Sequence, residues 1–230
     1  MTASALPLRI AVDGPVASGK SAVGQRLAEQ LSYLFFDTGV LYRAATFIAL
    51  RQLGSVQDAA AVMALTLQTH FEIQPPTQLQ RDGRAATVLA DLEDITREVR
   101  SAAVEAQVSL VAAMPEVRRL LTAQMRRVGL RGRVVMVGRD VGTVILPEAE
   151  LKIFLTAAVE TRAQRRFAEA QARGETRTYA EILENLRQRD HIDSTRAVAP
   201  LRPAEDAVIL YSDRLSADQV FEKVKALCNV

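Results

Sequence analysis

The residue pattern with the clearest chemical meaning is a glycine-rich run near the N-terminus. It reads Gly14-Pro15-Val16-Ala17-Ser18-Gly19-Lys20-Ser21 and matches the phosphate-loop pattern G-x-x-x-x-G-K-[ST]. In such a loop, backbone N–H groups and the start of the following helix bind phosphate, the lysine reaches terminal phosphates and the serine can bind Mg²⁺. An apolar run at residues 8–12 precedes the loop, and an amphipathic helix is predicted over residues 20–31. The pattern therefore predicts a nucleoside triphosphate site.

A second group of polar residues follows the next predicted strand, residues 33–36. It reads Asp37-Thr38-Gly39-Val40-Leu41-Tyr42-Arg43 and opens a helix. The carboxyl ends of parallel strands meet at one edge of a sheet, so we expect this run to lie beside the phosphate loop. There Arg43 can bind a second phosphate group through its guanidinium.

Several classes of protein contain a phosphate loop, including GTPases, motor ATPases and kinases of small molecules. The sequence contains no Asn-Lys-x-Asp run of the kind that reads guanine, which disfavours a GTPase. A length of 230 residues fits a kinase of small metabolites, with one compact domain and mobile lids. These observations favour a kinase.

Strands and helices alternate along the chain. Short apolar runs predict five strands, at residues 8–12, 33–36, 134–137, 152–155 and 207–211. Helical sequence separates them, and two helix starts carry capping boxes, Thr178 with Glu181 and Ser216 with Gln219. We therefore predict one α/β domain over residues 1–230, a parallel sheet with helices on both faces.

The residue pattern changes between residues 69 and 128. Alternating apolar residues at 70–74 and an apolar run at 86–89 predict a small β-containing insert. A helix is predicted from Ile95, and a second is predicted to begin at Pro115 and to end at Gly129.

The composition describes a globular chain, with 49% hydrophobic and 24% charged residues. Basic residues number 29 against 27 acidic ones and form no basic block, so we expect no nucleic-acid partner. Apolar stretches are shorter than the roughly 18 to 20 residues that a membrane span needs, so we expect no membrane role. One cysteine, Cys228, excludes an internal disulfide and fits a reducing, cytoplasmic location.

Four motifs in register resemble those of the bacterial cytidylate kinases. They are the phosphate loop preceded by Asp13, the run 37–43, Gly138-Arg139-Asp140-Val141-Gly142-Thr143, and the run 189–201. The resemblance extends from about Arg9 to the C-terminus. It implies a phosphate-loop kinase fold with a five-stranded parallel sheet, an acceptor-binding insert near residues 69–128 and a helical lid near residues 156–190. It also implies transfer of the γ-phosphoryl group of ATP to CMP or dCMP, with Mg²⁺ as cofactor.

The resemblance implies roles residue by residue. Gly14, Pro15, Val16, Ala17, Ser18, Gly19, Lys20 and Ser21 would hold the ATP phosphates, with Ser21 on Mg²⁺. The acceptor site would comprise Thr38, Tyr42, Arg43, Ser109, Arg118, Arg139, Asp140, Arg189, Asp193 and Arg196. The residues implied to act in catalysis are Lys20, Arg139 and the lid arginines Arg162, Arg165 and Arg166.

Within the implied acceptor site, Arg43, Arg139 and Arg196 would bind the phosphate, and Arg189 with Asp193 the sugar. Cytosine would be read by Ser109, Arg118 and Asp140. Cytosine carries an amino donor beside ring acceptors, so a carboxylate can accept from the amino group while a guanidinium donates to N3 or O2. Uracil presents the reverse pattern, and Asp140→Ala is therefore expected to erase the cytosine preference.

Two features leave alternatives open. Val137 stands where the family usually has an acidic residue, so Asp13 or Asp37 would have to assist the metal through water. The spacing of Arg162, Arg165 and Arg166 also suits a solvated helix face. The alternatives are a related kinase with a different acceptor and an ATP-binding module without turnover. We expect a monomer, since heptads are absent and monomers are usual in the family.

Overall fold

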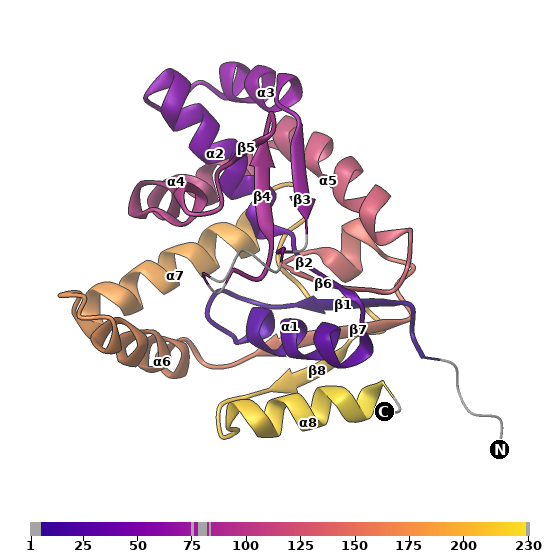
Figure 1. Ribbon diagram of the computed structural model, residues 1–230. Helices are drawn as coiled ribbons and strands as arrows, with labels where there is room; N and C mark the ends of the chain where they lie inside the picture. Colours follow the sequence, from indigo (N-terminus) through magenta and orange to yellow (C-terminus); the bar gives the residue numbers. More distant parts are fainter. Residues whose placement is uncertain (1–5, 75, 78–81, 83, 229–230) are drawn as a thin grey trace.

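The computed structural model describes residues 6–74, 76–77, 82 and 84–228 (Figure 1). Its centre is a five-stranded sheet of β1 (Arg9–Asp13), β2 (Leu34–Asp37), β6 (Val134–Gly138), β7 (Leu151–Thr156) and β8 (Val208–Tyr211). The strand order is β2-β6-β1-β7-β8, and every neighbouring pair is parallel. This confirms the predicted parallel sheet, with β1 and β2 each displaced by one residue from the predicted bounds.

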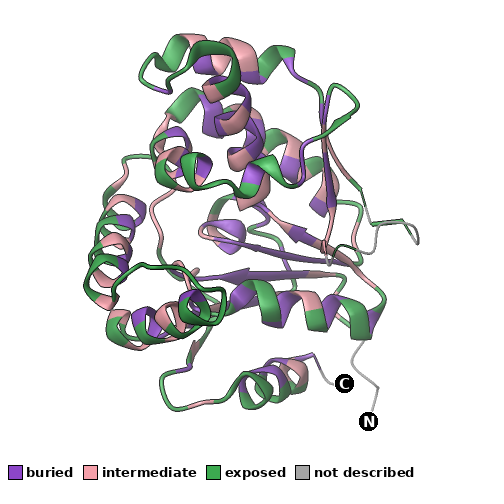
Figure 2. Cartoon of the chain, turned by 60° about the vertical axis from the view of Figure 1, so that its left-hand side comes forward, coloured by how far each residue is buried: buried purple, intermediate pink, exposed green. Residues whose placement is uncertain are grey.

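Helices cover both faces of this sheet. Ile10 and Val12 face the layer formed by α1 (Lys20–Leu31) and α8 (Ala217–Leu227). Ala11 faces the opposite layer, which includes α2 (Gly39–Leu53) and α5 (Pro115–Gly129). Figure 2 shows the central strands buried and the outer faces of the helices exposed, and β1 and β6 are the most buried strands, whereas β8 at the sheet edge is largely exposed. Burial on both faces explains why the central strands β1 and β6 read as continuous apolar runs.

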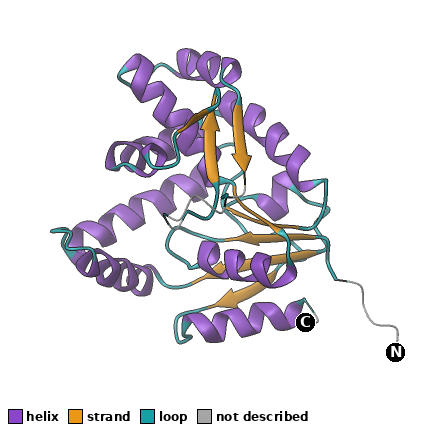
Figure 3. Ribbon diagram, viewed as in Figure 1, coloured by secondary structure: helices purple, strands orange, loops and turns teal. Residues whose placement is uncertain are grey.

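A second, smaller sheet stands above the first (Figure 3). It is antiparallel and has the order β3-β4-β5, with β3 at Phe71–Gln74, β4 at Thr87–Ala90 and β5 at Glu93–Asp94. The helix α3 (Ala59–Gln68) precedes it, and the 3-10 turn η1 (Glu98–Arg100) and α4 (Ala102–Ala113) follow it. The predicted β-containing segment is therefore present between α3 and α4.

The helix predicted from Ile95 is wrong at its start, because α4 begins at Ala102. Side-chain hydrogen bonds hold the preceding segment in a different conformation. The carboxylate of Asp94 accepts from the backbone N–H of Thr96 at 3.0 Å, and the Thr96 hydroxyl accepts from the N–H of Val88 at 2.8 Å. Such local bonds compete with helix formation.

Two helices form an antiparallel pair at the side of the sheet (Figure 1). They are α6 (Val159–Ala172) and α7 (Tyr179–Thr195), and Ala163, Ile182 and Leu186 pack between them. Both predicted capping boxes are present, at Thr178 before α7 and at Ser216 before α8. Among the described residues, none of the helices combines the length and apolar character needed to cross a membrane.

Candidate active site

The phosphate loop connects the end of β1 to the start of α1. A side chain at Gly14 would place its Cβ 2.0 Å from the carbonyl oxygen of Leu155, so this position requires glycine. Gly19 has a φ of 91° and caps α1, a conformation that favours glycine. The ammonium of Lys20 donates a hydrogen bond to the carbonyl of Pro15 at 2.9 Å and so crosses the loop. The loop thus has the folded-back shape that the sequence predicts.

A cavity of about 500 Å³ opens beside this loop. Six loop residues, Val16 to Ser21, lie in its wall. All ten predicted acceptor residues also line it, namely Thr38, Tyr42, Arg43, Ser109, Arg118, Arg139, Asp140, Arg189, Asp193 and Arg196. These residues come from five segments that are far apart in the sequence. The fold brings them to the carboxyl edge of the sheet, where ligands of open α/β sheets bind.

The most buried charged pair of the cavity is Arg118 with Asp140. Their side chains are 2% and 4% exposed, and the Arg118 guanidinium donates to the Asp140 carboxylate at 2.5 Å. Arg196 approaches the other oxygen of Asp140 at 3.4 Å, and Arg118 also lies over the ring of Tyr42. Within the part of the chain that the structure describes, the buried Nε of Arg118 has no hydrogen-bond partner. Buried polar atoms are normally paired, so the unpaired Nε is an unusual feature of a residue that lines the cavity.

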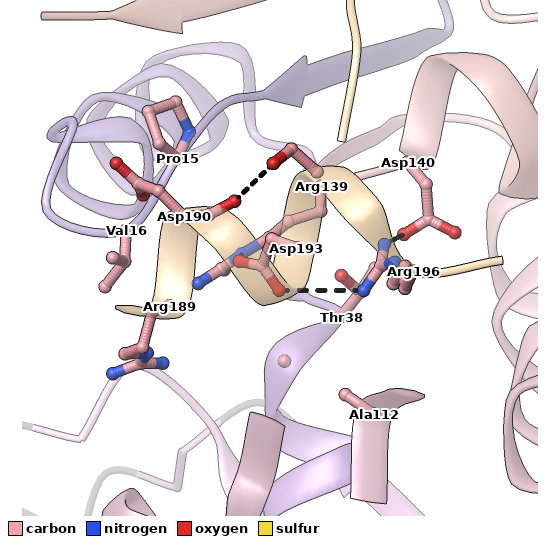
Figure 4. Close-up of polar contacts among 12 residues, drawn as sticks. Pro15, Val16, Thr38, Ala112, Arg139, Asp140, Arg189, Asp190, Asp193 and Arg196 are labelled. Carbon is pink, nitrogen blue, oxygen red and sulfur yellow. Dashed lines mark hydrogen bonds and ion pairs between the residues drawn. The ribbon is translucent and has the colours of Figure 1, made fainter. Parts of the chain in front are cut away.

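Asp193 lies between two of the predicted phosphate arginines. Arg139 Nε donates to its carboxylate at 3.0 Å, and Arg196 approaches the carboxylate at 3.7 Å (Figure 4). Burial alone would raise the pKa of Asp193, but Arg139 and the neighbouring arginines outweigh burial and lower it. Asp193 is therefore an anion that orients both guanidiniums.

Glu105 is a cavity residue that the sequence analysis missed. Its carboxylate accepts hydrogen bonds from Arg43, at 2.5 Å, and from Arg189. A glutamate in a helix is usually solvated, so its residue type does not indicate a place in a binding site. Its position does indicate one, because Glu105 precedes Ser109 by four residues and so lies on the same face of α4 as that predicted site residue.

The three arginines of the predicted lid have different environments. Arg162 is buried at 4% exposure, with hydrogen bonds from Nε to the Ala157 carbonyl, from Nη1 to the Val16 carbonyl and from both Nη atoms to Asp190. Arg165 lines the cavity and donates to the carbonyl and hydroxyl oxygens of Ser212. Arg166 also lines the cavity and pairs with the exposed Glu169. Of the three arginines, Arg166 therefore fits the alternative of a solvated helix face best, and Arg162 fits it least.

Oxygen ligands suited to a magnesium ion lie at the start of α1. The hydroxyl of Ser21 donates to the carboxylate of Asp37 at 3.0 Å, so the two side chains reach one point beside the loop. Mg²⁺ keeps several waters and needs only one or two protein oxygens beside substrate phosphates. Among the described residues, no group of three or more His, Cys, Asp or Glu side chains is arranged around a metal position. The donor set fits a magnesium ion that is held mainly by substrate.

Asp13 has a different environment. Its two carboxylate oxygens accept from the N–H groups of Val141 at 2.8 Å and Gly142 at 2.7 Å, the first residues of the π-helical turn η2 (Val141–Ile145). Burial raises the pKa of Asp13 to about 6, although these two N–H groups oppose the rise. Asp13 therefore connects the end of β1 to the segment that follows Arg139 and Asp140.

Val137 lies on the α1 side of the sheet and belongs to the apolar layer of β1, α1 and α8. A Cβ added at Gly24 of α1 would approach its side chain at 2.5 Å. Its carbonyl accepts hydrogen bonds from the N–H and hydroxyl of Thr38, both at 2.9 Å. Val137 thus contributes packing and a backbone acceptor that positions a cavity residue.

Replacing Asp13 with Asn is expected to lower the free energy of unfolding by about 2 kcal/mol, measured by chemical denaturation. A carboxamide can accept from only one of the two N–H groups and presents its own N–H group to the other. The control is Asp218→Asn, which removes an exposed pair with Arg26 and should change stability by less than about 1 kcal/mol. Equal losses in the two variants would contradict the role given to Asp13.

Comparison with known proteins gives a consistent result. The family model described as cytidylate kinase matches residues 10–229. A cytidylate kinase of Herpetosiphon aurantiacus is 48% identical over 224 residues, covering 97% of this chain and 95% of the relative. A cytidylate kinase of a Geobacillus species is 44% identical over 222 residues, covering 96% of each chain.

A solved structure of shikimate kinase from Bacteroides thetaiotaomicron is also similar, with 13% identity and a TM-score of 0.47. The match covers 97% of this chain and 99% of that chain. The family match and the two relatives extend over nearly the whole sequence, including the phosphate loop, the arginine-lined cavity and the β-containing segment. The chain belongs to the cytidylate kinase family.

Proposed function

We propose that this chain is a cytidylate kinase, which transfers the γ-phosphoryl group of ATP to CMP or dCMP and releases ADP and the nucleoside diphosphate. The observation that carries the proposal is that one cavity joins the phosphate loop to the buried pair of Arg118 and Asp140. The loop suits the donor, and the pair suits a cytosine base. Membership of the family supports both assignments.

The reaction is an in-line displacement. An oxygen of the CMP phosphate forms a bond to the γ-phosphorus of ATP, and the bond from that phosphorus to the bridging oxygen breaks, which leaves ADP. The acceptor phosphate carries about two negative charges near neutral pH and repels the triphosphate. Arg43, Arg139 and Arg196 would neutralise this charge and orient the attacking oxygen, because guanidiniums bind phosphate bidentately.

At the donor side, Lys20 lies across the loop and would contact the transferred group. Arg165 and Arg166 line the same cavity from α6, so they can approach that group when nucleotide is bound. Phosphoryl transfer through a loose transition state depends on positioning and on charge stabilisation rather than on covalent catalysis. Backbone N–H groups of residues 16–21, which line the cavity, would hold the α- and β-phosphates.

The nucleoside would occupy the far end of the cavity. Asp140 would accept from the cytosine amino group and Arg118 would donate to N3 or O2, while Ser109 adds a hydroxyl at the edge of the base. Arg189 and Asp193 would bind the sugar, and Thr38 and Tyr42 would complete the wall. The 2′-hydroxyl is one contact among many, so both CMP and dCMP are expected substrates.

Magnesium is the proposed cofactor. When bound, Mg²⁺ would neutralise negative charge on the triphosphate. Ser21 would hold it directly, and Asp37 through water, because the Ser21 hydroxyl already contacts Asp37. Both oxygens of Asp13 are engaged by backbone N–H groups, so we favour Asp37 of the two carboxylates.

The remaining assignments extend the same proposal. Residues 69–128 would act as the acceptor-binding insert, residues 156–190 would act as the lid, and the whole chain would form one kinase domain. Its partners would be ATP, CMP and dCMP rather than nucleic acid or a membrane. These nucleotides are cytoplasmic metabolites, so we place the enzyme in the cytoplasm. We propose that it acts as a monomer, as is usual in the family it belongs to.

ATP binding is expected to take up a proton at pH 8 and to weaken as the pH rises above 7. Burial, with the nearby Arg139, lowers the pKa of the Lys20 ammonium to about 7 in the free protein. A bound triphosphate favours the charged ammonium and raises this pKa, so the deprotonated fraction must bind a proton. Calorimetric titrations in two buffers with different ionisation enthalpies measure the uptake. Equal binding enthalpies in both buffers at pH 8 would contradict this prediction.

The direct test is a phosphotransfer assay with ATP and Mg²⁺ over CMP, dCMP, UMP, AMP and GMP, following ADP and the diphosphate product. The proposal predicts clear preference for CMP and dCMP, and loss of turnover in Lys20→Met. Preference for another acceptor would favour the related kinase with altered specificity. ATP binding without turnover, in folded protein, would favour the non-catalytic module.

A further inference from the structure

Glu105 gives the acceptor site its own internal anion. We propose that its carboxylate occupies the place of the acceptor phosphate at Arg43 in the ligand-free protein, and that the phosphate of CMP must displace it from Arg43 in order to bind, while Arg189 keeps further N–H groups for the sugar. This inference rests on the proposed function, because it concerns the same site. It makes Glu105 a positioning residue that sets the affinity for the acceptor.

The geometry supports this role directly. One carboxylate oxygen of Glu105 accepts from Arg43 Nη2 at 2.5 Å, and the other accepts from Arg189 Nη1. The two arginines come from α2 and α7, and Glu105 comes from α4, so three separate elements converge on one anion. A carboxylate held by two guanidiniums has the charge and hydrogen-bond pattern of a bound phosphate.

The surrounding charges explain why the empty site needs an anion. Burial is the main cause that lowers the pKa of the Arg189 guanidinium, and the positive charges of Arg139 and Arg43 lower it further. These cations repel one another when nothing neutralises them. Glu105 relieves the repulsion, and a phosphate group would relieve it in the same way. The two anions are therefore alternatives for the guanidinium of Arg43.

Glu105 is held in its charged form near neutral pH. Burial alone would raise its pKa, but Arg189 and Arg43 outweigh burial and lower the pKa to about 2. Its side chain is 29% exposed and lines the cavity, so it has room to turn toward solvent when the arginines engage a ligand. CMP binding is then an exchange of one anion for another, which weakens the apparent affinity for CMP.

Exchange has a consequence for the variant Glu105→Gln. Glutamine keeps the shape of the side chain but carries no charge, so the phosphate of CMP meets no competing anion. In the ligand-free variant, Arg43 and Arg189 lose the negative charge of Glu105. The dissociation constant for CMP is expected to fall about tenfold, which corresponds to about 1.4 kcal/mol. Cytidine lacks the phosphate, so its dissociation constant should not change. The melting temperature of the free variant should fall.

The experiment measures dissociation constants for CMP and cytidine by titration calorimetry, in the full chain and two variants. The matched control is Glu93→Gln, which removes a glutamate from an exposed pair with Arg51 on the same part of the fold. We expect tighter CMP binding in Glu105→Gln only, with cytidine unchanged in all three proteins. If Glu105→Gln fails to fold, Glu105→Asp keeps the charge but shortens the reach, and should tighten CMP binding by a smaller factor.

Two results would overturn the inference. One is unchanged or weaker CMP binding in Glu105→Gln while cytidine binding is preserved. If the Glu105 carboxylate competes with the phosphate, removing its charge must strengthen CMP binding. The other is an equal change for CMP and cytidine, which indicates a general structural effect. If the unaltered chain binds no CMP, the proposed function fails as well, and the titration of that chain distinguishes this failure from the other two.

Discussion

Asp140→Ala is expected to abolish the preference for CMP over UMP and to lower kcat/KM for CMP by about 1,000-fold or more. The carboxylate is 4% exposed and can accept from the amino group that distinguishes cytosine from uracil. UMP lacks that donor, so its kcat/KM should change far less. Steady-state kinetics with both nucleotides, under the same ATP and Mg²⁺ conditions, give the ratio directly.

Removing Asp140 also affects folding, because Arg118 and Arg196 lose their shared anion. Breaking a buried ion pair costs about 3 to 5 kcal/mol, so a second variant is needed as a control. Asp140→Asn has nearly the same shape, retains one acceptor and adds a donor that suits uracil. It should turn over UMP better than the unaltered enzyme. If Asp140→Asn keeps the full preference for CMP, Asp140 does not read the base.

Arg162→Lys is expected to lower kcat/KM for ATP by about 100-fold, the size of effect that misplacing a reacting group by about 1 Å produces. The Arg162 guanidinium connects the phosphate loop, through the Val16 carbonyl, to Asp190 of α7. A lysine ammonium keeps the positive charge but lacks the planar fork needed for these contacts together. The loop would then lose its connection to the helix pair.

The matched control for this variant is Arg187→Lys. Arg187 also joins α6 to α7, through an exposed pair with Glu160 at 3.2 Å, and exposed pairs contribute little. The control should retain nearly full activity and stability. Equal kinetics in the two variants would show that the contact with Val16 does not position the loop.

The sequence predicted the phosphate-loop region well because local physics determines it. The helix predicted over residues 20–31 matches α1 at both ends. Gly19 starts it, and apolar residues repeat every four positions along the face that packs on the sheet. The two capping boxes were equally local, since each depends on two side chains three residues apart.

Long-range pairing was not predictable in the same way. β1 lies between β6 and β7, which are more than 100 residues away in the sequence, and no local pattern encodes that order. The helix expected from Ile95 failed for a related reason. Ile95 is fully buried, and its N–H donates to the Val88 carbonyl of the preceding hairpin, a contact that the apolar pattern cannot reveal.

In the candidate site, too, features set by neighbouring residues were predicted and features set by distant contacts were not. Motifs identified many of the polar residues of the cavity wall, because each motif carries its chemistry in adjacent positions, whereas Ser109 and Arg118 lie outside the four motifs and followed from the family resemblance. The spacing of the lid arginines did not show that Arg162 is buried against the phosphate loop while Arg166 is at the surface. Residues three or four apart share a helix face whether or not that face is buried. Glu105 was missed because its two partners lie in other elements, α2 and α7.

A crystal structure of the chain with CMP would test the central claim most directly, because it locates both the base and the phosphate in the cavity. The account predicts the cytosine amino group within hydrogen-bond distance of the Asp140 carboxylate and the phosphate bound by Arg43, Arg139 and Arg196. A phosphate bound at Arg118, or a base that lies away from Asp140, would contradict it.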